Sequence, residues 1–208
     1  MKIAIIGAGN VGKALGMKLS QKGHQILYGV RDITNSKHDS LRNTPHFTLT
    51  TPHDAVQKVD IVLLAVPWKS SQQAIESLGS LADKILVDCT NPIKEDFSGL
   101  DVAHTTSGAE IIASWAKDAK VVKCFNQTGF TNMLNPLYGT QPSTMFAAGD
   151  DPDSVKIVAS LARDVGFDAV ELKGLILARQ LEQLAWLWIE IALKQGFKGE
   201  FSFCLLKR

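Results

Sequence analysis

The chain has 208 residues, of which 45% are hydrophobic and 21% charged, and its formal net charge is +1. This length can bury one sizeable hydrophobic core, alone or with a small appendage. With 22 basic and 21 acidic residues and no cationic run, the chain lacks the electrostatic signature of proteins that bind nucleic acids or anionic membranes. Those partners are therefore excluded, and any anion that binds must be held by a local site.

Short apolar runs of strand length alternate with segments of helical period, as in βαβ units around a mostly parallel sheet. Strands are expected at residues 2–6, 25–30, 47–50, 60–66, 84–89, 120–125, 144–148 and 169–172. Helices are expected at residues 11–22, 52–58, 70–81, 108–116, 153–165 and 175–195. Gly23 caps the end of the first helix, and Ser107 with Glu110 forms a capping box before the fourth. The sequence therefore predicts a doubly wound α/β fold.

Neither a secretion signal nor a membrane span is expected. The apolar run in MKIAII stops at Gly7, which is too short for a signal peptide. The most apolar later segment, residues 175–193, would bury Arg179, Glu182 and Glu190 if it crossed a membrane. The three cysteines lie far apart without a CxxC pair, so we expect reduced, buried thiols at Cys89, Cys124 and Cys204. These features together indicate a cytoplasmic protein.

The segment GAGNVG at residues 7–12 directly follows the first expected strand and opens the first expected helix. In this context GxGxxG is the fingerprint of dinucleotide-binding Rossmann folds. Gly7 permits the tight turn, Gly9 lets the backbone approach a pyrophosphate, and Gly12 allows close packing of helix on strand. The pyrophosphate would then rest on the helix N-terminus, where free N–H groups and the helix dipole favour negative charge. The alternative is a plain βα turn.

Arg31 follows the second expected strand, where a protein selective for NAD(H) would carry an acid for the adenosine ribose. Its guanidinium can clamp a 2′-phosphate through two N–H groups, so NADP(H) is the expected cofactor. Asp32 opposes this interpretation, because a carboxylate turned toward the ribose would favour NAD(H). Lys37 and the hydroxyls of Thr34 and Ser36 are further candidates for the phosphate site. Alternatively, Arg31 is an ordinary exposed cation at a strand end.

Three later loops are expected at the same edge of the sheet, where open α/β folds bind ligands. Pro67 and Trp68 end the fourth strand, and the indole suits packing against a cofactor ring, although it can equally cover the next helix. Asn91 and Asn126, after the fifth and sixth strands, offer amides for a nicotinamide carboxamide or a second ring.

Motifs for acid–base, nucleophilic or metal chemistry are missing from the sequence. It contains no GxSxG, HExxH, CxxC or P-loop motif, and its five histidines have no ligand-like spacing. His24 is expected to be structural, and His104 is a minor candidate for the pocket. A site without an acid, base or nucleophile suits hydride transfer between two bound rings, for which alignment and exclusion of water supply most of the catalysis.

Six segments carry a family resemblance over nearly the whole chain: IAIIGAGNVGKALGMKLSQKGH, YGVRD, AVPW, CTNP, SGAEIIASWAKDAKVVKCFN and ARQLEQLAWLWIEIAL. In these segments the chain resembles the NADP oxidoreductases dependent on coenzyme F420, a deazaflavin, whose nucleotide domain is shared by membrane-anchored metalloreductases. The resemblance implies a Rossmann domain with a small C-terminal helical part, a dimer, and hydride transfer between NADPH and a flavin-like ring. It assigns the pyrophosphate to Gly7, Gly9, Asn10, Val11 and Gly12, the 2′-phosphate to Arg31, and the lining of the cleft to Val66, Pro67 and Trp68.

Two positions depart from the pattern of that family. Val30 stands where a serine or threonine often helps to bind the phosphate, and Asn126 stands where deazaflavin-using members have a histidine. The expected cofactor-binding residues are Gly7, Ala8, Gly9, Asn10, Val11, Gly12, Arg31, Ser36, Lys37, Ala65, Val66, Pro67, Trp68, Asn91 and Asn126, with no catalytic residue and no metal ligand.

The leading hypothesis for function is an NADP(H)-dependent oxidoreductase that passes hydride between NADPH and a small-molecule acceptor, a flavin or a deazaflavin such as F420. The alternative is a non-catalytic NADP(H)-binding sensor or partner domain. Reduction of an imine or carbonyl substrate is disfavoured, because only one long terminal helix remains to build a substrate domain.

The expected C-terminal helix is apolar over much of its circumference. Its main stripe is Leu177, Leu181, Leu184, Leu187, Ile191 and Lys194, with Trp186 and Trp188 pointing elsewhere. One Rossmann face cannot cover so much apolar surface, so a homodimer interface is expected, the alternative being a helix buried within its own subunit. The expected organisation is an NADP-binding Rossmann domain at residues 1–150 and a strand and helical extension at residues 151–208, packed on the same domain and contributing the dimer contact.

Overall fold

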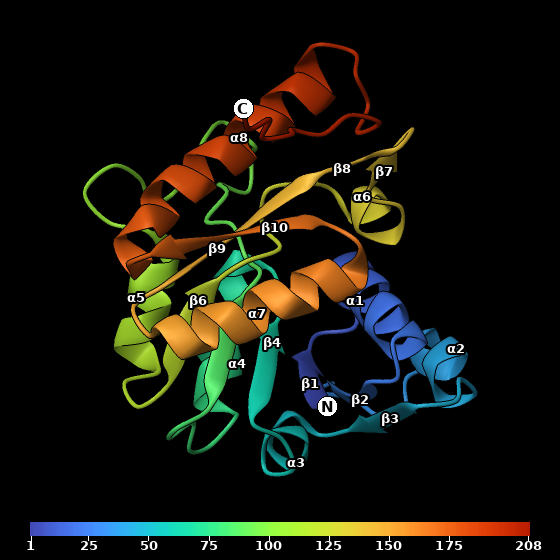
Figure 1. Ribbon diagram of the computed structural model, residues 1–208. Coiled ribbons are helices and arrows are strands. Elements are labelled where there is room, and N and C mark those ends of the chain that lie inside the picture. The colour runs from blue at the N-terminus through green and yellow to red at the C-terminus, as the bar shows by residue number, and fades with distance from the viewer.

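The computed structural model describes residues 1–208, and its centre is one eight-stranded sheet (Figure 1). The strand order is β10-β9-β6-β5-β4-β1-β2-β3, which contains the Rossmann order of strands 3-2-1-4-5-6. All neighbouring strands are parallel except β6 and β9. The strands are β1 (Lys2–Ile6), β2 (Gln25–Gly29), β3 (Phe47–Thr50), β4 (Ile61–Leu64), β5 (Ile85–Asp88), β6 (Lys120–Lys123), β9 (Thr144–Gly149) and β10 (Asp168–Lys173). The predicted doubly wound, mostly parallel α/β fold is confirmed.

Helices cover both faces of this sheet. They are α1 (Asn10–Gln21), α2 (Asp39–Arg42), α3 (Pro52–Val56), α4 (Ser71–Glu76), α5 (Gly108–Trp115), α6 (Phe130–Leu134), α7 (Pro152–Val165) and α8 (Ala178–Lys194), with short 3₁₀ turns η1 (Ser36–His38), η2 (Trp68–Ser70) and η3 (Leu175–Leu177). Residues of α1 and α7 share one hydrophobic cluster with the sheet, and residues of α3, α4, α5 and α8 share the other.

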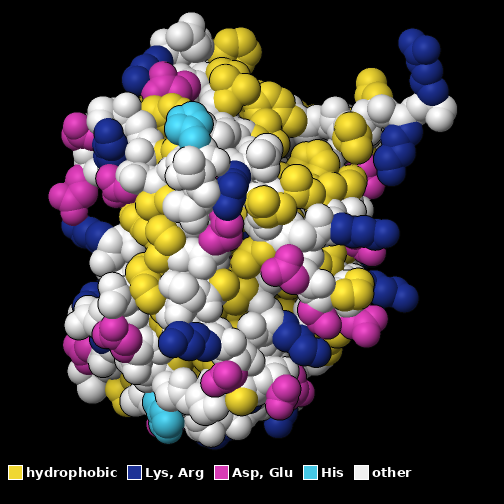
Figure 2. Space-filling view, turned by 90° about the vertical axis from the view of Figure 1, so that its left-hand side faces the viewer, with side chains coloured by type: hydrophobic (Ala, Val, Ile, Leu, Met, Phe, Trp, Pro, Cys, Tyr) yellow, Lys and Arg dark blue, Asp and Glu magenta, His cyan; other side chains and the backbone are white.

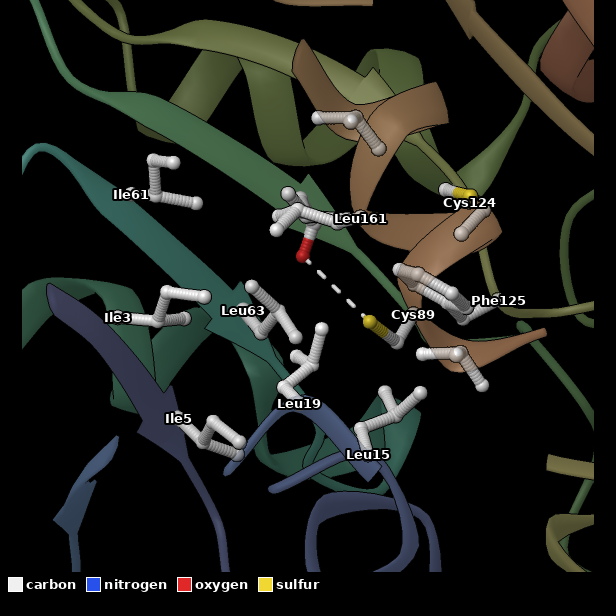
Figure 3. Packing of buried hydrophobic residues seen from close by; sticks show 14 of the residues in the cluster. Ile3, Ile5, Leu15, Leu19, Ile61, Leu63, Cys89, Cys124, Phe125 and Leu161 are labelled. Carbon is white, nitrogen blue, oxygen red and sulfur yellow. Dashed lines mark hydrogen bonds between the residues drawn. The ribbon is translucent and has the colours of Figure 1, made fainter. Parts of the chain in front are cut away.

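The alternation of side chains along β1 explains the two layers. Ile3 and Ile5 belong to the first cluster, whereas Ala4 and Ile6 belong to the second, because successive residues of a strand point to opposite faces. Figure 3 shows part of the first cluster, in which side chains of the central strands meet those of α1 and α7. Strands that are covered on both faces need apolar side chains at successive positions. β4 is apolar at all four of its positions, and β1 is apolar at every position except Lys2, which is exposed.

Local sequence signals account for several helix ends. Ser107 accepts a hydrogen bond from the Glu110 backbone N–H at 3.1 Å, which confirms the predicted cap of α5. Gly23 has a φ of +83° and its N–H donates to Ser20 O at 2.9 Å, so it ends α1 as predicted. The helix predicted at residues 70–81 is shorter, because α4 ends at Glu76 and the left-handed Gly79 (φ +76°) cannot continue it.

Several small elements were not predicted. They are η1, α2, α6 and a separate hairpin of β7 (Leu137–Tyr138) and β8 (Gln141–Pro142). Each is too short to show a hydrophobic period. Helix α8 was predicted, and of the apolar stripe named from its sequence only Leu181 lies on the face that packs inward. The inward residues are Ala178, Leu181, Glu182, Ala185, Trp188 and Ala192, whereas Leu187 is 50% exposed.

Two other expectations concern the cysteines and a membrane span. Cys89 and Cys124 are buried as predicted, but Cys204 is exposed because it lies in the C-terminal segment beyond α8. None of the helices combines the length and the apolar character needed to traverse a bilayer.

Candidate cofactor-binding cleft

A cavity of about 730 Å³ opens at the carboxyl ends of β1, β2 and β4. The strand order reverses at this place, because β2 lies on one side of β1 and β4 on the other. Ligands of doubly wound sheets bind at such a reversal. Its walls come from the loops after these three strands and from η2 and α4. A second cavity of about 460 Å³ lies at the opposite edge, where β1, β2 and β3 begin, and has no helix N-terminus in its lining.

The glycine loop forms the floor of the cleft. Gly7 has a φ of +103°, and a Cβ there would lie 2.5 Å from the carbonyl oxygen of Ala65. A Cβ at Gly12 would overlap the carbonyl oxygen of Gly7. A Cβ at Gly9, by contrast, would meet no atom within 4 Å and would occupy open space. Gly7 and Gly12 are therefore required by the fold, whereas Gly9 leaves space in the cleft for a ligand.

The N-terminus of α1 has unpaired donors beside that open space. No side chain caps the helix, and its first turn carries no acidic residue. The first backbone N–H groups of a helix have no intrahelical partner, and together with the helix dipole they attract an anion. The absent side chain at Gly9 and the uncapped helix end together fit a pyrophosphate.

The loop after β2 brings two cations to one end of the cleft. Arg31 and Lys37 line the cavity, and neither side chain makes a hydrogen bond or an ion pair. Asp32, by contrast, accepts hydrogen bonds from the N–H of Thr34 at 2.9 Å and from its hydroxyl at 2.6 Å. The hydroxyl and N–H of Thr34 lower the pKa of Asp32. The carboxylate therefore stays ionised but is held by its own loop.

The guanidinium of Arg42 holds this loop in place. It donates to the carbonyl oxygens of Ile33 and Asn35 and pairs with Asp39. The side chain of Asn35 also accepts from the N–H of Lys37 at 3.1 Å. The loop that carries the two free cations is thus ordered by contacts within residues 31–42.

One wall of the cleft was not predicted from the sequence. Ser70, Gln73, Ala74 and Ser77 line the cavity opposite the β2 loop. Their spacing of three or four residues places them on one face of the helical segment after Pro67. That spacing is the signal that would have identified them.

His38 was also missed as a residue of the cleft. It lines the cavity and is only 4% exposed, and its Nδ1 has no hydrogen-bond partner. Burial, followed by the charges of Lys37, Lys13 and Arg42, lowers the pKa of His38 below its ordinary 6.5. Its position one residue after Lys37 was the available signal. The other histidines lie elsewhere: His24 is buried between Asp164 and the N-terminus, and His104 is exposed.

Trp68, Asn91 and Asn126 do not line the cavity. The indole of Trp68 stacks on Trp115 of α5, with ring centroids 5.8 Å apart and an interplanar angle of 24°. Asn91 donates to Asn126 O at 2.8 Å, and Asn126 donates to Asn91 Oδ1 at 3.0 Å and to Leu181 O at 3.1 Å. The two amides therefore join the ends of β5 and β6 to each other and to α8.

A buried charge cluster lies beneath these amides. Lys123 of β6 is fully buried and contacts Asp88 Oδ2 and Glu182 Oε1, each at 2.8 Å, and Thr90 O at 2.7 Å. Glu182 also accepts from the N–H groups of Gly108 and Ala109 at the start of α5. Burial alone would lower the pKa of Lys123, but the two carboxylates outweigh it and leave that pKa raised. The cluster ties α8 to the sheet at the carboxyl edge.

The predicted binding residues thus fall into three groups. Those that line the cavity are Gly7, Ala8, Gly9, Arg31, Lys37, Ala65, Val66 and Pro67. Those in the first turn of α1 are Asn10, Val11 and Gly12. Those outside the lining are Ser36, Trp68, Asn91 and Asn126. Val30 lies in the cavity wall. Because its side chain is apolar, position 30 offers no hydroxyl to a phosphate.

The fold and the cleft define a Rossmann-type nucleotide-binding protein. Residues 2–92 match the model of the family described as NADP oxidoreductase, coenzyme F420-dependent. A crystal structure of a candidate F420-dependent NADP reductase from Arthrobacter sp. FB24 is 30% identical, covers 100% of both chains and superimposes with a TM-score of 0.91.

Two curated relatives differ in how much of their own length they share with this chain. An F420-dependent NADP reductase from Methanothermobacter marburgensis is 25% identical over 96% of both sequences. The metalloreductase STEAP3 from Rattus norvegicus is 27% identical over 88% of this chain but only 36% of its own length. The chain belongs to the coenzyme F420-dependent NADP oxidoreductase family and is an NADP-dependent oxidoreductase.

Proposed function

We propose that this protein transfers hydride between NADPH and a flavin or deazaflavin, with NADP(H) lying along the cleft at the carboxyl ends of β1, β2 and β4. The observation that carries the proposal is the pair of unpartnered cations, Arg31 and Lys37, in the cavity wall. A guanidinium and an ammonium without protein partners suit a 2′-phosphate. Asp32 does not compete, since its carboxylate is bonded to Thr34.

The remainder of the dinucleotide fits the other features of the cleft. The pyrophosphate takes the open space at Gly9 and accepts hydrogen bonds from the first turn of α1. The adenosine lies between the β2 loop and the wall of Ser70, Gln73 and Ala74. The nicotinamide extends toward the ends of β5 and β6, where Asn91 and Asn126 support the loops.

The chain contributes alignment and exclusion of water to the reaction. When bound, NADPH supplies the hydride, and a ring-to-ring transfer needs no protein acid, base or nucleophile. The amide pair of Asn91 and Asn126 and the cluster around Lys123 keep the nicotinamide end of the cleft rigid. Rigid supports suit this reaction, because small displacements of two reacting rings cost a large part of the rate.

The relatives favour a deazaflavin as the acceptor. The chain spans nearly all of the F420-dependent NADP reductase but about a third of the metalloreductase. Position 126 does not supply the histidine of the deazaflavin-using members. Asn126 is 4% exposed, and its amide is bonded to Asn91 and Leu181, so it is not free to contact the acceptor ring. The polar contacts of the acceptor ring must then come from neighbouring residues.

The acceptor is tested by anaerobic mixing of the purified protein and NADPH with F420, FMN, FAD, riboflavin or a ferric chelate, followed by absorbance of NADPH. We expect oxidation with F420 or one of the flavins. Oxidation with the ferric chelate alone would overturn the flavin acceptor, and tight binding of NADPH without turnover would favour the sensor function.

Cofactor selectivity is tested separately with Arg31→Ala. The variant is expected to weaken NADPH binding at least roughly tenfold while changing NADH binding little, because a charge-assisted hydrogen bond contributes about 1.5–3 kcal/mol. Isothermal titration calorimetry of both nucleotides gives the comparison. Equal losses for NADPH and NADH would show that Arg31 does not contact the 2′-phosphate.

A further inference from the structure

His38 is a buried polar side chain of the cleft wall for which the chain provides no partner. It ends η1, directly after Lys37, and is 4% exposed. Its Nδ1 is buried without a hydrogen bond, which is uncommon for polar atoms in folded proteins. The other ring nitrogen, Nε2, also makes no hydrogen bond within the chain but is not enclosed. Because the ring lines the cavity that holds Arg31 and Lys37, Nε2 is the atom that a ligand in that cavity can reach.

The charges around His38 keep its ring neutral in the free protein. Three cations face it: Lys37 from its own turn, Lys13 from α1 and Arg42 from α2. The carboxylate of Asp32 opposes them, and Arg42 is itself paired with Asp39, the residue after His38. Burial and the three cations lower the pKa of the imidazole, so the ring carries no charge near pH 7.

We propose that His38 is a third phosphate-binding group, which takes up a proton from solvent when the 2′-phosphate binds and then donates an N–H to it. The inference rests on the proposed function, since it requires that phosphate to lie between Arg31 and Lys37. A dianion at this place reverses the local electrostatics, because an opposite charge within about 4–6 Å favours the protonated ring. One proton leaves solvent and binds the ring nitrogen, and no other bond changes.

The sign of the pH dependence follows from this linkage. The bound state holds the imidazole proton more tightly than the free state does, so affinity for a 2′-phosphorylated ligand rises as pH falls through the bound-state pKa. The gain levels off below the free-state pKa, which itself lies below 6.5. The 2′-phosphate acts in the opposite direction, because it loses its second negative charge near pH ~6. A variant without the imidazole is therefore the necessary reference.

The test uses two probes that fill only the adenosine end of the cleft, adenosine 2′,5′-bisphosphate and 5′-AMP. Calorimetry from pH 6 to pH 8.5 gives the ratio of their dissociation constants for the native chain and for His38→Gln. We expect the native preference for the bisphosphate to exceed that of the variant by roughly tenfold near pH 6.5, and the two to converge toward pH 8.5. Titrations in buffers of different ionisation enthalpy should show that the native chain takes up more protons than His38→Gln when the bisphosphate binds.

A second measurement does not depend on affinity. The ring C–H resonance of His38, assigned by its absence in His38→Gln or in His38→Asn if the former does not fold, is titrated with and without each probe. We expect the bisphosphate, but not 5′-AMP, to raise the pKa of the imidazole.

The outcomes separate the inference from the proposed function. Equal pH slopes for the native chain and the variant, with a bisphosphate preference that Arg31→Ala reduces, would overturn the role of His38 alone. A native chain that binds both probes equally, or a preference that Arg31→Ala leaves undiminished, would overturn the phosphate site and the inference together.

Discussion

Gly9 allows folding and nucleotide binding to be changed independently. Its φ of −78° suits any residue, and a Cβ would meet no atom within 4 Å. Gly9→Ala should therefore leave the free energy of unfolding unchanged or raise it by about 0.4–1 kcal/mol, since alanine restricts the unfolded chain. The methyl group occupies the space proposed for the pyrophosphate, so NADPH binding should weaken at least roughly tenfold. Urea denaturation and calorimetry measure the two effects.

Gly7→Ala is the matched control within the same loop. Its φ of +103° and the clash with the carbonyl oxygen of Ala65 should reduce stability by about 1–3 kcal/mol. A Gly9→Ala chain that is destabilised as much as Gly7→Ala would show that Gly9 serves the fold rather than the ligand.

At the scale of elements, the buried cluster around Lys123 connects β5, β6 and α8. Lys123→Met leaves Asp88 and Glu182 buried without their cation, so we expect a loss of about 3–5 kcal/mol in the free energy of unfolding. Lys120→Met is the control, because Lys120 lies on the same strand but its side chain is 46% exposed, and it should cost less than about 0.5 kcal/mol. If urea denaturation gave similar losses of unfolding free energy for both variants, the cluster would not be the source of the stability.

A second link joins α5 to α8. The carboxylate of Glu110 accepts two hydrogen bonds from Arg179, at 2.9 Å and 2.6 Å, and the Arg179 guanidinium lowers the pKa of Glu110 below its ordinary 4.5. A depressed carboxyl pKa stabilises the fold above the ordinary value, and this contribution is lost as pH falls through the folded value.

Glu110→Gln should therefore be less stable than the native chain at pH 7, while the difference should shrink as pH falls below 4.5. Urea midpoints at pH 7 and at pH 3.5 give the comparison. A difference that persists unchanged in acid would show that Glu110 contributes packing rather than charge.

Elements with a strong local signal were predictable, and those defined by tertiary contacts were not. The apolar runs and glycines fixed β1, α1 and β2 to within a residue. The face of α8 that packs on its own sheet was not predicted, because Glu182 turns inward to Lys123, a contact between distant segments. The pattern of apolar residues on a helix cannot predict that a carboxylate is buried when its partner lies on a distant strand.

The candidate site shows the same division. Gly7, Gly9, Arg31 and Lys37 were predicted from local context, and the structure brings them together in one cavity. The surroundings of Trp68 depend on α5 and those of Asn126 on α8, so their contacts could not be read from the sequence. The partnerless ring of His38 is likewise visible only in three dimensions.

At the scale of the whole molecule, we propose a homodimer formed through the extension at residues 151–208, with residues 1–150 holding the cofactor. Helix α8 leaves Leu187 50% and Leu193 64% exposed, and Phe197 after it is 58% exposed. Figure 2 shows hydrophobic side chains gathered in the upper half of the face on which α8 lies. Apolar surface of this kind commonly marks a protein interface.

Light scattering should then give twice the 22.6 kDa mass of one chain. The double substitution Leu187→Lys with Leu193→Lys should yield monomers, whereas Ile157→Lys, at a 38% exposed position of α7, should not. A native mass of 22.6 kDa in dilute solution would exclude the dimer.

The short surface segment held by Arg42 has an evolutionary consequence. Arg31, Lys37 and His38 all belong to residues 31–42, whose order depends on bonds within the segment itself. In the proposed function, cofactor preference is concentrated in this cassette of residues, of which only Leu41 belongs to the hydrophobic core. Exchange of this cassette between relatives offers a route to a new coenzyme that does not require rebuilding the scaffold.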